Sequence, residues 1–62
     1  MTDRTATETL KAAIKCLNNY NTTGKGYMLD NGLALADKGL AMVSATTDMS
    51  VVAECKRLME TV

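Results

Sequence analysis

A seven-residue repeat in the middle of the chain restricts the fold most strongly. The segment MLDNGLA, residues 28–34, is followed directly by LADKGLA, residues 35–41. A period of seven is typical of an α-helix that packs against others along a seam. The repeat therefore predicts a helix over about residues 27–45, in a protein of the all-α class.

Two glycines, Gly32 and Gly39, occupy the same position of this repeat. A glycine inside a helix costs roughly 1 kcal/mol relative to alanine. At heptad spacing the pair leaves a shallow channel where another helix can approach closely, and we expect close packing there. The alternative is that the glycines are tolerated without a packing role, or that one of them ends the helix. The apolar arc is wider than one partner helix covers, so we expect this helix to be central, with helices on both sides.

The N-terminal part has a second helical pattern. Thr5 and Glu8 match a capping box, with Thr5 as the N-cap residue. The apolar residues that follow recur at i, i+3, i+4 and i+7; they are Leu10, Ala13, Ile14 and Leu17. This pattern predicts a helix over about residues 6–19, ended by the polar stretch that follows.

A third helix is predicted over about residues 49–61. Its apolar residues recur at i, i+4, i+7 and i+11; they are Val51, Cys55, Leu58 and Val62. The preceding run SATTD, residues 44–48, holds several residues that favour helix N-caps. We expect a break near Thr46, although one bent helix through both segments is the alternative.

The chain of 62 residues allows one small domain, residues 1–62. It has no Phe or Trp, and a chain this short buries only about 60% of the surface that its unfolded form exposes. Small proteins of this kind need disulfides, metals or self-association. We expect three short helices whose bundle is completed in a homodimer or higher homo-oligomer. The predicted packing positions are Leu29, Gly32, Leu33, Leu35, Ala36, Gly39, Leu40, Val43, Val51, Cys55 and Leu58.

The composition argues against an enzyme and against a metal site. The chain has no His, and Cys16 and Cys55 are its only cysteines. Two thiols do not complete a four-ligand zinc site, and neither has an adjacent base that would activate it. We expect both to be packing residues, and we expect no catalytic residues, no metal and no cofactor.

Charge and hydropathy narrow the partners and the location. The formal net charge is zero, with seven basic and seven acidic residues. A clustered basic face, which nucleic-acid binding needs, is missing, so we consider nucleic acid an improbable partner. No apolar run approaches the 18 or so residues of a membrane span, and the first ten residues, MTDRTATETL, contain no apolar signal segment. These features predict a cytoplasmic protein without a membrane partner.

The segment NNYNTTGKGY, residues 18–27, holds both aromatic residues of the chain. It has two interpretations. The first is an ordinary linker between helices, because Asn, Thr and Gly favour turns and helix ends. The second is a loop that binds a phosphate-bearing ligand with two glycines, a lysine and the N-terminal end of the next helix. The candidate ligand-binding residues are Tyr20, Asn21, Thr23, Lys25 and Tyr27.

These observations predict a non-enzymatic, oligomeric helical interaction protein. Its expected role is that of a small regulator or inhibitor that acts by occlusion or sequestration, as in accessory proteins of bacteria and their phages. The expected partners are the protein itself and another protein. The alternative is a small-molecule binder that sequesters a nucleotide or other phosphate-bearing ligand through residues 18–27 at subunit junctions.

Overall fold

The computed structural model describes residues 4–45 and 47–61, with side chains from Ala6 onward. These residues form three α-helices, α1 (Arg4–Thr23), α2 (Gly26–Ala41) and α3 (Met49–Thr61). The described residues contain no strand, so the predicted all-α class is confirmed. The two predicted helices after residue 26 are separate, because residues 42–48 are not helical where they are described.

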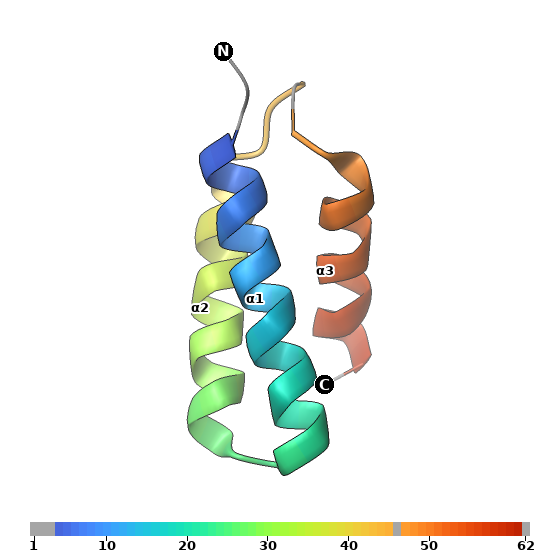
Figure 1. Cartoon of the computed structure of the whole chain (residues 1–62). Coiled ribbons are helices and arrows are strands. Elements are labelled where there is room, and N and C mark those ends of the chain that lie inside the picture. Colours follow the sequence, from blue (N-terminus) through green and yellow to red (C-terminus); the bar gives the residue numbers. More distant parts are fainter. Residues whose placement is uncertain (1–3, 46, 62) are drawn as a thin grey trace.

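Helix α1 lies in the middle, with α2 and α3 on either side of it (Figure 1). It runs antiparallel to α2 and parallel to α3, and it contacts both, whereas α2 and α3 touch each other only sparingly. The prediction that residues 27–45 form the central helix is therefore wrong. The glycine side of α2 is covered by α1 alone, and the rest of the wide apolar arc of α2 is only partly covered.

The two longer helices pack through the glycine pair. A Cβ atom built on Gly39 would lie 2.7 Å from Leu10 Cδ2, and one built on Gly32 would lie 2.8 Å from Leu17 Cδ2. Both leucines are fully buried. The same antiparallel register places Ala13 opposite Ala36, and these two are also fully buried. The expected close packing at the glycines is confirmed, and the helix that approaches is α1 of the same chain.

Helix α1 is longer than predicted at both ends. Thr5 lies inside α1, so its predicted role as the N-cap is wrong. The predicted end at residue 19 is also wrong, because the helix continues to Thr23. The hydroxyls of Thr22 and Thr23 donate to the carbonyls of Asn18 and Asn19 at 3.0 and 2.8 Å. These are bonds from threonine side chains to the carbonyls four residues earlier, inside the last turns of the helix.

The turn between α1 and α2 is only two residues long. Gly24 has φ +74°, and its N–H donates to the Tyr20 carbonyl at 2.7 Å. This left-handed conformation after a helix is a common C-terminal cap that glycine adopts without a steric penalty. Lys25 then precedes α2 with an extended backbone, and its carbonyl accepts from the Met28 N–H at 3.0 Å.

Helix α2 ends at Ala41 rather than at the predicted residue 45. The Ser44 N–H donates to Thr47 Oγ1 at 2.9 Å, and the Thr47 N–H donates to the Ser44 carbonyl at 3.2 Å. This reciprocal pair replaces the helical hydrogen bonds that would continue α2. Thr47 is buried, so the connection is fixed against the bundle.

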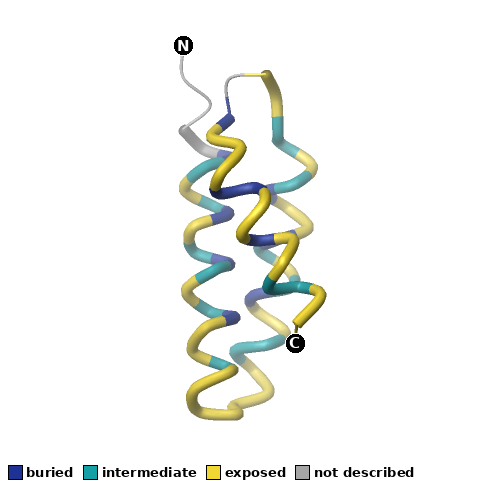
Figure 2. Tube along the Cα trace, turned by 90° about the vertical axis from the view of Figure 1, so that its right-hand side faces the viewer, coloured by how far each residue is buried: buried dark blue, intermediate teal, exposed yellow. Residues whose placement is uncertain are grey.

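The predicted bounds of α3, residues 49–61, are confirmed. The Asp48 side chain accepts from the Ser50 N–H at 3.0 Å, which is the geometry of an N-cap. Val51 and Cys55 are buried in one cluster with Leu10, Ala13 and Ala36, and this cluster is the centre of the bundle (Figure 2).

Candidate interaction surface

The candidate ligand-binding residues lie at the tip of the α1–α2 hairpin, mostly inside helices. Tyr20, Asn21 and Thr23 belong to the end of α1, and Tyr27 is the second residue of α2. Only Lys25 among them lies in the turn. The predicted loop over residues 18–27 is therefore the end of one helix, a two-residue turn and the start of the next.

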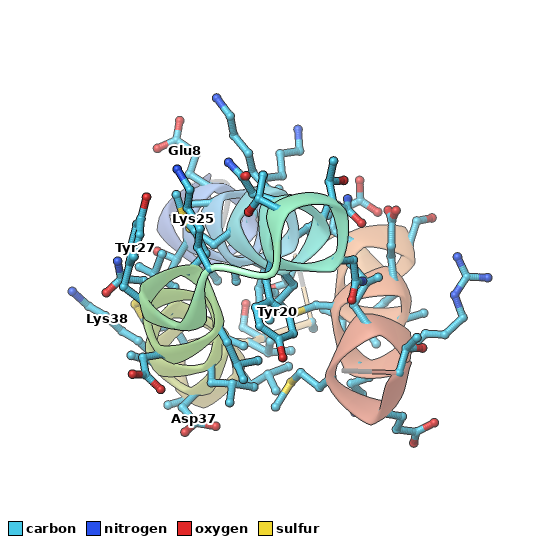
Figure 3. All side chains as sticks on the ribbon, turned by 90° about the horizontal axis from the view of Figure 1, so that it is seen from below. Glu8, Tyr20, Lys25, Tyr27, Asp37 and Lys38 are labelled. Atoms are coloured by element: carbon cyan, nitrogen blue, oxygen red, sulfur yellow. The ribbon has the colours of Figure 1, made fainter. Side chains whose placement is uncertain are left out.

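The two tyrosines point in different directions (Figure 3). Tyr27 is 56% exposed on the outer side of α2, and the Lys25 ammonium lies 5.9 Å from its ring centroid, within cation–π range. Tyr20 is half-buried and points from α1 into the space between α2 and α3. Within one chain the two rings therefore do not line a common pocket.

The polar groups at the tip of the hairpin form hydrogen bonds within the end of α1. The Thr23 hydroxyl bonds to Asn19, through its carbonyl and, at 3.5 Å, its side-chain oxygen. The Gly24 N–H, which a phosphate loop would direct at a ligand, bonds to the Tyr20 carbonyl. Gly26 has open space around it, and the N–H groups at the start of α2 face the tip of the hairpin.

The predicted packing positions divide into two groups. The buried group is Gly32, Ala36, Gly39, Val51 and Cys55. The half-buried group is Leu29, Leu33, Leu35, Leu40, Val43 and Leu58. The prediction omitted Leu10 and Leu17, which are fully buried, although their helical spacing marked them as members of an apolar stripe. Leu10 and Leu17 are seven residues apart, as are Gly32 and Gly39. This equal spacing was the signal in the sequence that could have included the two leucines.

Several half-buried apolar side chains lie on the side of the molecule that α1 does not cover. Helices α2 and α3 flank this side, and Tyr20 points into it from α1 (Figure 3). We call it the α2–α3 face. Its apolar members, by burial and helical spacing, are Tyr20, Leu29, Leu33 and Leu40, together with Met49 and Met59 from α3.

The α3 side of this face is notably exposed. Met49 is 60% exposed, one of two large hydrophobic side chains among the described residues with such high exposure. Met59 is half-buried against the central cluster. Flexible methionine side chains adapt to the shape of a partner and are used at protein-binding surfaces.

Charged residues border the face on both helices. On α2, two carboxylates alternate with two leucines at i, i+3, i+7 and i+10, so both carboxylates lie beside the apolar residues. These residues are Asp30, Leu33, Asp37 and Leu40. Figure 3 shows Asp37 on the side of α2 directed away from α1. On α3, Met49, Val52, Lys56 and Met59 have the same spacing. One edge of the face is therefore acidic, and the other carries Lys56, with Glu60 one turn further along α3.

The described residues contain no group of three or more His, Cys, Asp or Glu side chains that could hold a metal ion. Burial raises the pKa of the Cys55 thiol, which favours the unreactive protonated form. Cys16 is half-buried beside Gly32 and forms no disulfide.

Within the part of the chain that is described, no helix combines the length and the hydropathy that a membrane crossing requires. Comparison with known proteins gives no family model that matches and no significant match among curated proteins or solved structures.

Proposed function

We propose that this protein is a non-enzymatic helical interaction protein that binds another protein through the α2–α3 face. The observation that carries the proposal is the sparse contact between α2 and α3, which leaves the apolar residues between them only half-buried. A small bundle gains stability by covering such a face, because burial of apolar surface is the main favourable term in association.

The mechanism we propose is occlusion of a partner surface. The described chain is an elongated body of 37 × 16 × 14 Å, and the α2–α3 face follows its long dimension. A rigid body of this size covers a stretch of partner surface without any catalytic group. Regulation or inhibition of the partner, in a bacterial or phage setting, is the biological role that fits this mechanism.

The experiment compares three immobilised forms of the protein in a lysate of the cells that produce it. The variant Leu33→Asp places a charge in the centre of the face. The matched control Ala34→Asp adds the same charge at the next residue, on an exposed part of α2. We expect a protein that is retained by the wild type and by Ala34→Asp but lost with Leu33→Asp, and its binding should be reproduced with purified components. Retention of the same proteins by all three forms would contradict the proposal.

A further inference from the structure

The two edges of the α2–α3 face carry opposite charges beside the same buried cluster. Asp37 follows Ala36 on α2, and Lys56 follows Cys55 on α3. Ala36 and Cys55 belong to this one cluster, so the two charged residues flank the same part of the bundle. Both are exposed, and neither forms an ion pair within residues 4–45 and 47–61. The face thus presents an unpaired carboxylate on one side and an unpaired ammonium on the other.

We propose that a second copy of this chain occupies the α2–α3 face. The two copies are related by a two-fold axis parallel to the helices, so that α2 of each copy lies against α3 of the other. A rotation about this axis preserves height along the bundle. It therefore brings the α2 edge with Asp37 against the other copy's α3 edge with Lys56, and it brings Leu33 and Leu40 to the side of the opposite α3 that carries its methionines.

The charge pattern selects this arrangement over other occupants. A partner whose surface carries charge of a single sign would be attracted by one edge of the face and repelled by the other. This chain carries charges of both signs and is complementary to itself. The alternative two-fold axis, perpendicular to the helices, places α2 against α2, so that the two acidic edges with Asp30 and Asp37 face each other, which is unfavourable.

A dimer of ordinary size would cover about one fifth of this chain, since a stable interface buries about 800 Å² on each partner and the surface of the chain is 4030 Å². An interface along α2 and α3 encloses apolar side chains between two charged edges, which resembles the apolar core and polar rim of known interfaces.

The first test measures mass in solution by sedimentation velocity over micromolar to millimolar concentrations. We expect a reversible dimer for the wild type and for the control Ala34→Asp. The variant Leu33→Asp should be monomeric while it retains its helical circular dichroism. A wild type that stays monomeric over the whole range would overturn the proposal.

The second test uses charge reversal and does not depend on the folding of Leu33→Asp. In homodimers of Asp37→Lys two lysine pairs face each other, and in homodimers of Lys56→Asp two aspartate pairs do. Each single variant should raise the dissociation constant roughly tenfold, since two exposed ion pairs are lost and replaced by repulsion. An equimolar mixture of the two variants restores both pairs, so native mass spectrometry should show the mixed dimer in excess over both homodimers. A statistical distribution of the three dimers would refute the proposed orientation.

This inference shares its surface with the proposed function, and the experiments separate their failures. A monomeric wild type whose capture of another protein is abolished by Leu33→Asp removes the dimer and keeps the interaction function. A dimer that passes the charge-reversal test, with capture unaffected by Leu33→Asp, keeps the dimer and moves partner binding to another surface.

Discussion

Gly32 and Gly39 are the residues at which the backbone of α2 meets the side chains of α1. The absence of Cβ atoms there lets Leu17 and Leu10 lie against the helix backbone. The sequence could reveal the notch, because two glycines seven residues apart are costly in a helix unless something fills the space. It could not reveal which helix fills it. Helix α1 of the same chain and a helix of a second copy both carry aliphatic side chains that could fill the notch. Helix α1 fills it because the short turn brings α1 alongside α2.

The substitution Gly39→Ala tests this packing at a single residue. The added Cβ would lie 2.7 Å from Leu10 Cδ2 and 3.3 Å from the Leu10 backbone nitrogen. Leu10 is fully buried and has little room to move. Overpacking costs about 1–3 kcal/mol, while alanine gains about 0.5–1 kcal/mol over glycine in a helix. We therefore expect a net loss of about 1 kcal/mol in the free energy of unfolding, measured by urea denaturation.

The matched control is Gly26→Ala. No atom lies within 4 Å of a Cβ at that position, and the backbone there is helical. The control should leave the free energy of unfolding unchanged or raise it slightly. A gain in stability for Gly39→Ala equal to that of the control would show that the notch is not tightly filled in solution.

At the scale of the helices, the end of α1 shows where tertiary packing outweighs local preference. The stretch NNYNTT, residues 18–23, consists mostly of Asn and Thr, which are weak helix formers. The sequence pattern alone therefore predicts an end at residue 19. In the structure, the last turns of α1 include the half-buried Tyr20, and the threonine hydroxyls bond to the carbonyls of Asn18 and Asn19. The true stop signal is Gly24, whose positive φ is available to glycine at low cost. By contrast, α3 was predictable to the residue because its N-cap, Asp48, directly precedes its apolar stripe.

The substitution Gly24→Ala tests this helix end. No atom lies within 4 Å of a Cβ at Gly24, so steric overlap with neighbouring residues contributes nothing. The backbone has φ +74°, and a left-handed conformation costs a residue with a Cβ about 1–2 kcal/mol. We expect the free energy of unfolding to fall by about 1 kcal/mol. The variant Gly24→Asn should lose less, because asparagine tolerates this conformation. Equal stability of the alanine, asparagine and wild-type forms would argue against the left-handed turn.

The arrangement of the whole molecule was the least predictable level. Each helix has an apolar stripe, and periodicity does not say which stripe lies in the middle. The structure places α1 there, and the largest fully buried side chains are only Leu10, Leu17 and Cys55. So small an interior agrees with the expectation that copies of the chain associate. However, the glycine notch is filled within one chain, so the dimer that we propose uses the α2–α3 face instead.

Amide hydrogen exchange gives a test at this scale. Helix α3 is held mainly by α1 and only sparingly by α2, whereas α1 and α2 are paired along most of their lengths. Segments with fewer buried contacts open at lower free energy, so in dilute protein the α3 amides should exchange faster than those of α1.

In the proposed dimer, α3 is covered by α2 of the other copy. A partner concentration of 100 times the dissociation constant stabilises the bound form by about 2.7 kcal/mol. Protection of α3 should therefore rise by up to about a hundredfold with concentration in the wild type and stay constant in Leu33→Asp. Concentration-independent exchange of α3 in the wild type would mean that its outer side is not covered by a second chain.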